Sequence, residues 1–249
     1  MRGRAPVEGL DMPRTRQLDM TLGLFSRGDA LMRTLTEIFN ENFSDKGTVM
    51  EGWEAHGYSP LYEQWFDPIR EQPIRLLEIG VCDPRKPGAS LVSWYEYFPT
   101  AQIFGYDIVD ATEFDNDRIK TFMGDQSSPT DLQRFVDMYG GDFDIIIDDG
   151  SHIDAHQQAR LAFLFQFVKP GGQYVVEDMQ VSPNTLEVLK EIQKRRYSPR
   201  NYVRQLVSRL RHTAPRPLVP QSALRRIQAN TTSVDILCND KLGRLVKRK

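Results

Sequence analysis

Short apolar runs alternate with stretches of helical spacing between residues 75 and 196, and few folds accommodate this alternation. The apolar runs cover 75–81, 102–109, 120–124, 143–148 and 173–178, and helical spacing covers about 88–98, 129–140, 154–168 and 183–196. Runs rich in Val, Ile and aromatic residues are typical of buried parallel strands. Strands that alternate with helices predict a mostly parallel, doubly wound α/β sheet of Rossmann-like type, with helices on both faces.

Both ends of the chain add to this sheet. A closing antiparallel β-hairpin is predicted from residues 231–238 and 244–247, which brings the expected total to seven strands. Residues 239–243 would connect the two strands, and Gly243 would give this connection its backbone freedom. Helical spacing over 29–43 and aromatic residues over 58–70 predict a short helical N-terminal extension. The expected organisation is a disordered N-terminus (1–20), a helical cap (21–72) and the sheet domain (73–249), with a basic, proline-punctuated insert at 197–230.

Basic residues gather in the last quarter of the chain. From Lys190 to Lys249 there are sixteen Lys or Arg residues against three acids, although the formal net charge of the whole chain is −2. Such asymmetry favours an anionic partner. RNA is one candidate, but only Tyr197 and Tyr202 offer stacking surfaces in this segment, so nucleic acid is not the favoured partner. A phosphorylated acceptor and the acidic surface of a neighbouring subunit are the alternatives.

Several protein classes do not fit the sequence. No stretch approaches the ~18 apolar residues that span a bilayer, and the first residues lack the apolar region of a secretory signal. Two cysteines, Cys82 and Cys238, are too few for a disulfide framework or a four-cysteine metal site. We therefore expect a cytoplasmic protein without a membrane partner.

Polar residues follow the first three strands at the edge where an open α/β sheet binds its ligands. Glu78 and Gly80 end the first strand, and no further glycine follows until Gly88, so the G-x-G-x-x-G fingerprint of dinucleotide sites is absent. Asp107 ends the second strand, where an acid can accept hydrogen bonds from both ribose hydroxyls of an adenosine. The third strand ends with Asp125 and Gln126, which are placed to meet an adenine amino group. A tight turn without ligand and plain solvation are the alternatives for these positions.

Carboxylates gather after the next two strands. Asp148 and Asp149 open the segment DDGSH, and Glu177 and Asp178 end the fifth strand. Adjacent carboxylates disfavour each other's ionisation unless a cation is near, and a hard divalent ion such as Mg²⁺ takes oxygen ligands. His152 follows Asp149 by three residues and is a candidate general base.

Two other interpretations of these residues stay open. The acids of DDGSH can instead cap the N-terminus of the following helix, with His152 as an ordinary loop residue. His152 and His156 are spaced as a zinc pair, but no Cys or further His lies near in sequence to complete such a site.

At these residues the sequence resembles the class I S-adenosylmethionine-dependent methyltransferases. More closely it resembles the Mg²⁺-dependent sugar O-methyltransferases of macrolide biosynthesis, of the mycinamicin and macrocin type. The match runs from about Trp53 to Asp178 and includes W-x-x-H-x-Y-x-x-x-Y, LLEIGV, PGASL, YFPTAQIFGYDI, GDQSS, DIIIDDGSH and GGQYVVED. The offsets from Asp149, which are +3 to His152, +28 to Glu177 and +29 to Asp178, are also similar to those of catechol-type methyltransferases.

The resemblance implies a role for each matched position. The methyl donor S-adenosylmethionine would be bound by Glu78, Gly80, Ser90, Asp107, Asp125, Gln126 and Asp148. Mg²⁺, or another hard divalent cation, would be held by Asp149, Glu177 and Asp178. His152 would take the proton of the acceptor hydroxyl, and Tyr58 would form a wall of the acceptor pocket. The family's second glycine in the first loop is Cys82 or Asp83 here, which leaves the donor contacts of that loop open.

The implied activity is O-methylation of a sugar hydroxyl in a glycosylated natural product or antibiotic intermediate, by a homo-oligomer. Three alternatives remain. Proteins of the cephalosporin hydroxylase type share the sheet and a similar DDGSH segment. A methyltransferase that binds RNA or a nucleotide sugar would use the basic C-terminal segment. A catalytically idle subunit that binds donor without metal is disfavoured because Asp149, His152, Glu177 and Asp178 are all present.

Overall fold

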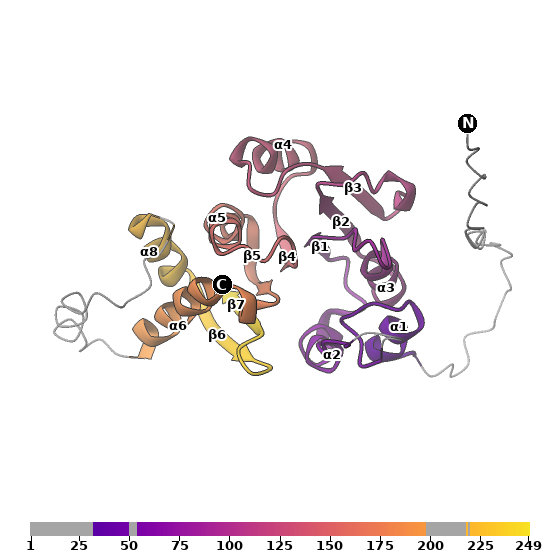
Figure 1. Cartoon of the computed structure of the whole chain (residues 1–249), viewed down its shortest axis with the longest axis horizontal. Coiled ribbons are helices and arrows are strands. Elements are labelled where there is room, and N and C mark those ends of the chain that lie inside the picture. Colours follow the sequence, from indigo (N-terminus) through magenta and orange to yellow (C-terminus); the bar gives the residue numbers. More distant parts are fainter. Residues whose placement is uncertain (1–31, 50–53, 198–217, 219) are drawn as a thin grey trace, which may run out of the picture. The chain divides into compact units, whose positions relative to one another are not determined.

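One mixed sheet is the centre of the computed structural model, which describes residues 32–49, 54–197, 218 and 220–249. Within these residues seven strands are ordered β3-β2-β1-β4-β5-β7-β6 (Figure 1). The strands are β1 (Arg75–Ile79), β2 (Gln102–Asp107), β3 (Ile119–Met123), β4 (Phe143–Asp148), β5 (Val168–Val176), β6 (Thr231–Leu237) and β7 (Leu242–Lys247). The pairs among β1 to β5 are parallel, whereas β7 is antiparallel to both β5 and β6. The predicted fold class is confirmed.

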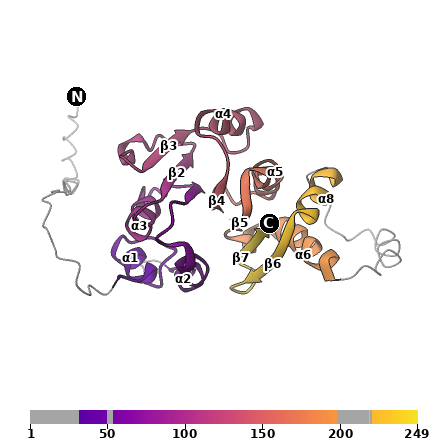
Figure 2. The same ribbon diagram turned by 180° about the vertical axis from the view of Figure 1, so that it is seen from behind.

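Helices cover both faces of this sheet (Figures 1 and 2). The buried residues of one face form a cluster with α4 (Pro129–Tyr139), α5 (Asp154–Leu164), α6 (Pro183–Tyr197) and α8 (Gln221–Ala229). Those of the other face join α1 (Leu35–Glu41), α2 (Ser59–Phe66) and α3 (Ala89–Tyr97). In β4, Ile146 belongs to the first cluster and Ile145 and Ile147 to the second, which explains why three consecutive positions of this strand are apolar.

The register of the central strands brings the predicted site residues to one level. Ile79 pairs with Asp148, and Asp148 pairs with Val176, so β1, β4 and β5 end side by side. The ladder continues one residue further, because the Asp149 amide donates to the Ile79 carbonyl at 3.0 Å and the Glu177 amide to that of Asp148 at 3.0 Å. Asp149 and Glu177 therefore leave the sheet as neighbours.

The C-terminal hairpin corrects one detail of the sequence interpretation. Gly243 is not in the connection but inside β7, opposite Val176 and Ile236. The left-handed backbone positions of the turn are Cys238, Asn239 and Asp240. Gly243 is needed for space instead, since a Cβ there would lie 2.4 Å from a methyl carbon of Leu189.

The segments outside the sheet agree only partly with the predicted secondary structure. Helix α8 lies inside the segment expected to be an irregular basic insert, and α1 is shorter than the predicted 29–43. Four short 3₁₀ turns, at 67–69, 112–114, 165–167 and 179–181, complete the described secondary structure. The predicted disordered N-terminus (1–20), Trp53 and most of 197–217 lie outside the described residues, and the proposed domain boundaries remain predictions.

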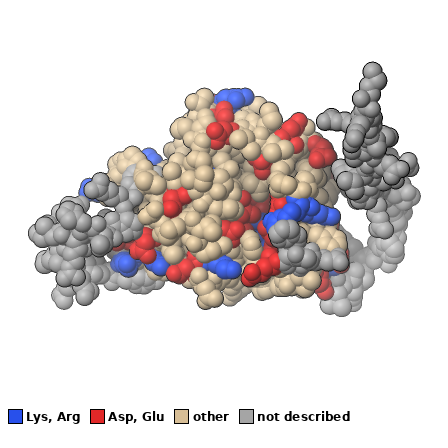
Figure 3. Space-filling view, viewed as in Figure 1, with Lys and Arg blue, Asp and Glu red and all other residues tan. Residues whose placement is uncertain are grey.

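Charges on the described surface are mixed. Acidic and basic side chains are interspersed over the face in Figure 3. Some basic residues of the last quarter have partners inside the fold: Lys190 bonds to Asp240 at 2.9 Å, and Arg244 bonds to Asp235 at 2.9 and 2.6 Å. Part of the C-terminal charge therefore stabilises the hairpin and its neighbour α6. None of the described helices is long and apolar enough to cross a membrane.

Candidate active site

A cavity of about 810 Å³ opens at the carboxyl ends of the central strands. Four of the residues predicted to bind the donor line it, namely Gly80, Ser90, Asp107 and Gln126. Asp149, His152 and Asp178 line the same cavity. The structure thus places the predicted donor site next to the predicted metal site.

Gly80 is required by the close approach of two strand ends. Its φ is +87°, and a Cβ would lie 2.0 Å from the carbonyl oxygen of Asp149. A left-handed backbone and this contact both exclude a side chain. The turn after β1 can therefore lie against the segment that carries Asp149.

Asp107 accepts hydrogen bonds from the backbone of the loop that follows β1. One carboxylate oxygen, Oδ2, accepts the amides of Val81 at 2.8 Å and Cys82 at 2.9 Å, while Oδ1 accepts the amide of Val109 at 3.0 Å. These bonds compensate for the missing second glycine, because they hold the loop at Cys82 in a defined conformation. One lone-pair site of the same carboxylate, on Oδ1, remains for a ribose hydroxyl.

Gln126 lines the cavity, and its side-chain oxygen is bonded within the protein. Its Oε1 accepts the amide of Ser151 at 3.0 Å and a hydrogen bond from the guanidinium of Arg160. Both groups can only donate, which leaves Nε2, a donor, as the end of the amide that a ligand could meet. A donor would pair with an accepting ring nitrogen of an adenine rather than with its amino group, and the adenine contact itself stays a prediction.

Three residues predicted to bind the donor do not line the cavity. Glu78 is fully buried, and its Oε2 accepts the indole N–H of Trp94 at 3.1 Å. The Oδ1 atom of Asp125 accepts the amide of Ser127 at 2.7 Å, on the surface. Asp148 is fully buried and paired with Arg160. The structure therefore gives these three acids contacts within the protein.

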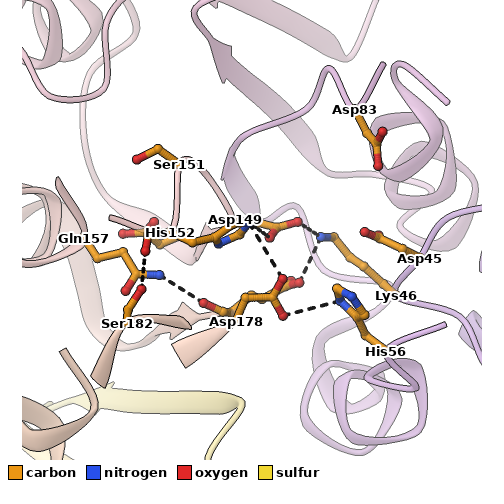
Figure 4. Close-up of polar contacts among 12 residues, drawn as sticks. Asp45, Lys46, His56, Asp83, Asp149, Ser151, His152, Gln157, Asp178 and Ser182 are labelled. Carbon is orange, nitrogen blue, oxygen red and sulfur yellow. Dashed lines mark hydrogen bonds and ion pairs between the residues drawn. The ribbon is translucent and has the colours of Figure 1, made fainter. Parts of the chain in front are cut away.

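Asp149, His152 and Asp178 converge at one point of the cavity. One potential ligand atom from each lies within 4.8 Å of the other two. Nε2 of His152 is 3.7 Å from Oδ2 of Asp178 and 3.9 Å from Oδ1 of Asp149 (Figure 4). His156 is not part of this group; its Nδ1 lies 2.9 Å from the hydroxyl of Ser151.

Backbone strain is concentrated at two of these positions. His152 has a φ of +52° and Asp178 one of +54°, which is uncommon for residues other than glycine. Ser182 donates to the carbonyl of His152, and Gln157 donates to the carbonyl of Glu177 at 3.0 Å (Figure 4). Conformations of this kind persist where the surroundings hold them, and they cluster at functional sites.

Glu177, the third predicted metal ligand, is not in this group of three. Its Oε1 accepts the hydroxyl of Tyr62, and its Oε2 lies 3.1 Å from Nζ of Lys46. The same ammonium bonds to Asp149. Sequence reasoning missed Lys46, which precedes Trp53, the first residue of the recognisable motifs, by seven positions.

Two more residues of the N-terminal segment touch the cluster. Tyr58 is fully buried, does not line the cavity, and donates to Oδ1 of Asp178 at 2.7 Å. Nδ1 of His56 lies 3.4 Å from the same oxygen. The W-x-x-H-x-Y motif pointed to both, but not to a role as supports of Asp178.

The cluster carries more negative charge than its own cations offset. Burial raises the pKa of Glu177, and burial together with the charge of Glu177 raises that of Asp149. Burial alone would raise the pKa of Asp178 as well, but His56 and the hydrogen bond from Tyr58 outweigh it and lower the value. Such a set of crowded oxygen ligands fits a hard divalent cation.

His152 is set up as a neutral base. Burial lowers its pKa, although Asp178 and Asp148 oppose this shift. Its Nδ1 is buried without a hydrogen-bond partner among the described residues, while Nε2 faces the carboxylates. An unprotonated imidazole at the edge of a cavity can accept a proton.

Known proteins share this arrangement of sequence and fold. Over 148 residues the chain is 47% identical to the mycinamicin VI 2''-O-methyltransferase of Micromonospora griseorubida. Over 133 residues it is 43% identical to the 8-demethyl-8-alpha-L-rhamnosyl tetracenomycin-C 2'-O-methyltransferase of Streptomyces olivaceus. Its homologues are antibiotic sugar O-methyltransferases. The predicted resemblance is thereby confirmed, although no family model matches the chain.

A solved methyltransferase structure has the same fold. The MycE methyltransferase of the mycinamycin biosynthetic pathway, in complex with Mg and SAH, superposes with a TM-score of 0.65 at 30% identity. The superposition covers 88% of this chain and 55% of MycE. The sequence alignments cover 58% of this chain and 36% of the mycinamicin enzyme, and 52% and 35% for the tetracenomycin enzyme. The chain therefore matches only part of the length of these relatives.

Proposed function

We propose that the chain is an S-adenosylmethionine- and Mg²⁺-dependent O-methyltransferase that acts on a sugar hydroxyl of a glycosylated natural product. The convergence of Asp149, His152 and Asp178 beside the cavity is the observation that carries this proposal. Homologues named as sugar O-methyltransferases support it. The MycE structures, which contain Mg and SAH, support the choice of cofactors.

The cavity fits the methyl donor. Asp107 would bind the ribose, the Nε2 of Gln126 a ring nitrogen of the adenine, and Gly80 with Ser90 would border the methionine end. Glu78, Asp125 and Asp148, which the resemblance also assigned to the donor, would act indirectly by shaping the strand ends.

Asp149 and Asp178 would hold the divalent cation, with Glu177 as the third ligand implied by the resemblance. The cation would supply Lewis acidity that lowers the pKa of the acceptor hydroxyl and fixes its orientation. Tyr58 and His56 hold Asp178 at the point where it faces Asp149. The excess of buried carboxylates would be relieved by this charge.

His152 would be the general base. The acceptor oxygen forms a bond to the methyl carbon of S-adenosylmethionine while the carbon–sulfur bond breaks, and S-adenosylhomocysteine leaves. The proton of the hydroxyl passes to Nε2 of His152, the nitrogen that faces the carboxylates. General-base assistance of this kind contributes about 10²–10⁴-fold to the rate.

We extend the proposal to the assembly and location expected from the sequence, a homo-oligomer in the cytoplasm. Light scattering after size-exclusion chromatography measures the oligomer. The acceptor is proposed as an antibiotic glycoside, because the names of the relatives specify mycinamicin VI and a rhamnosyl tetracenomycin.

Methyl transfer from labelled S-adenosylmethionine tests the proposal. We expect label in mycinamicin VI or a rhamnosyl tetracenomycin, S-adenosylhomocysteine as the second product, and loss of transfer in EDTA with recovery in Mg²⁺. Full activity in EDTA would exclude the metal role. Absence of S-adenosylhomocysteine binding by calorimetry would exclude the donor and favour the cephalosporin-hydroxylase alternative, whereas salt-dependent RNA binding would favour the RNA alternative.

A further inference from the structure

Lys46 lies inside the carboxylate cluster. Its side chain is 1% exposed, and Nζ contacts Asp149 (Figure 4), Oε2 of Glu177 at 3.1 Å and Oε1 of Glu78 at 3.3 Å. These acids follow or belong to β4, β5 and β1, so one ammonium joins three strand ends. Burying a charged amine is costly unless it is paired in this way.

The backbone around Lys46 aims the side chain at the cluster. The Ser44 amide donates to the Phe39 carbonyl at 2.9 Å, at the end of α1, and the Ser59 amide donates to the Lys46 carbonyl at 2.9 Å, at the start of α2. The His56 amide adds a bond to the Asp45 carbonyl at 2.7 Å. The loop is thus tied at both sides, and the position of Lys46 is a property of the fold rather than of a free surface chain.

The ammonium and the candidate metal share ligands. Asp149 turns Oδ2 to Lys46 and Oδ1 to the side where His152 lies, and Glu177 turns Oε2 to Lys46. A cation that used both Asp149 and Glu177 would stand where Nζ stands now. Two positive charges at the same oxygens repel each other strongly in a buried site.

Glu78 is a further ion-pair partner of the Lys46 ammonium. Its Oε1 is buried without a hydrogen bond among the described residues and lies 3.3 Å from Nζ, while Trp94 anchors Oε2 at 3.1 Å. Glu78 does not line the cavity. It can therefore keep the ammonium paired after Asp149 and Glu177 have turned to another cation.

We propose that Lys46 is an exchangeable internal cation of this site. In the metal-free protein it holds Asp149 and Glu177 together, and on binding of a divalent cation it yields both carboxylates and pairs with Glu78. This rests on the proposed metal-dependent function. The exchange adds to that function that the affinity for the divalent cation is set by competition with Lys46 for Asp149 and Glu177.

Mg²⁺ titration by calorimetry, without acceptor and at one pH, tests the exchange. Lys46→Met should bind Mg²⁺ about tenfold more tightly than wild type, since a competitor is removed, and should melt at a lower temperature in EDTA. Glu78→Gln should bind Mg²⁺ more weakly, because Lys46 loses its second partner. The double variant should behave as Lys46→Met does. Lys86→Met is the control, because Lys86 lines the same cavity but lies over the Phe43 ring.

The outcomes separate the two proposals. If wild type does not bind Mg²⁺, the metal dependence fails and the exchange fails with it. If wild type binds but Lys46→Met binds equally or more weakly, only the exchange is overturned. Should the variants not fold, wild-type crystals grown in EDTA and in Mg²⁺ decide: we expect the contact of Lys46 with Asp149 only in EDTA, and its persistence beside a bound ion would refute the exchange.

Discussion

Arg160 donates two hydrogen bonds to one oxygen of Asp148, from Nε at 2.9 Å and from Nη2 at 2.5 Å, and both side chains are fully buried. The hydroxyl of Tyr174 donates to the other oxygen at 2.9 Å. Arg160 also bonds to Gln126, so this pair links the core to the donor cavity. Of the two adjacent acids at the end of β4, Asp148 thus pairs in the core and Asp149 lines the cavity.

Asp148→Ala should destabilise the protein by about 3–5 kcal/mol, because it leaves the Arg160 guanidinium buried and unpaired. Urea denaturation measures the change in the free energy of unfolding. Glu187→Ala is the matched control, since its contact with Lys190 is half-exposed, and it should cost less than about 1 kcal/mol. A stable Asp148→Ala variant that loses S-adenosylhomocysteine binding would instead favour the direct donor contact predicted from the sequence.

His152→Ala should lower kcat by about 10²–10⁴-fold, since the proton acceptor is lost. Binding of S-adenosylhomocysteine, measured by calorimetry, should stay unchanged. His156→Ala, which removes a neighbouring imidazole outside the carboxylate group, should keep most of the activity. A near-normal rate for His152→Ala would show that another group takes the proton.

The pH dependence should reflect the lowered pKa of His152. Burial lowers this pKa, and the base works only when unprotonated, so activity should stay level through neutral pH. It should fall only as the pH drops below the range in which an ordinary imidazole titrates. The profile of kcat/KM against pH measures this, and a loss of activity that already begins on going below pH ~7.5 would contradict it.

Gln126→Glu should exchange a hydrogen-bond donor for an acceptor at the adenine while keeping the oxygen that Arg160 and Ser151 contact. We expect S-adenosylhomocysteine to bind about tenfold more weakly. S-inosylhomocysteine, whose N1 carries a hydrogen, should show the opposite preference and bind the variant better than wild type. Equal losses for both ligands would show that Nε2 does not meet a ring nitrogen.

Gly80→Ala should destabilise the chain more than Gly171→Ala. The two glycines have similar positive φ values, +87° and +85°, but a Cβ at Gly80 would lie 2.0 Å from the carbonyl of Asp149, whereas at Gly171 the nearest atom is 3.4 Å away in the Lys249 side chain. Overpacking of this kind adds about 1–3 kcal/mol to the cost of a side chain at positive φ. Thermal unfolding measures the difference, and equal costs would mean that the strand ends can move apart.

Local patterns in the sequence were sufficient for the fold, and seven of the predicted site residues line the cavity. Buried parallel strands need apolar residues on both faces, so their runs are visible without a structure, and the offsets of His152, Glu177 and Asp178 from Asp149 follow from strand ends. The same reasoning misplaced Gly243, because a glycine required for space inside a strand has the same letter as one required by a turn.

The tertiary structure alone decided which atoms meet. It paired Asp148 with Arg160, bonded the side-chain oxygen of Gln126 to Arg160, and made Tyr58 a support of Asp178. It also brought Lys46 to Asp149 across 103 positions of the sequence. No periodicity encodes such a contact, because it arises from the packing of one loop against three strand ends. The sequence by itself determined a parallel sheet with acids at its carboxyl edge; the fold decided how their charge is compensated.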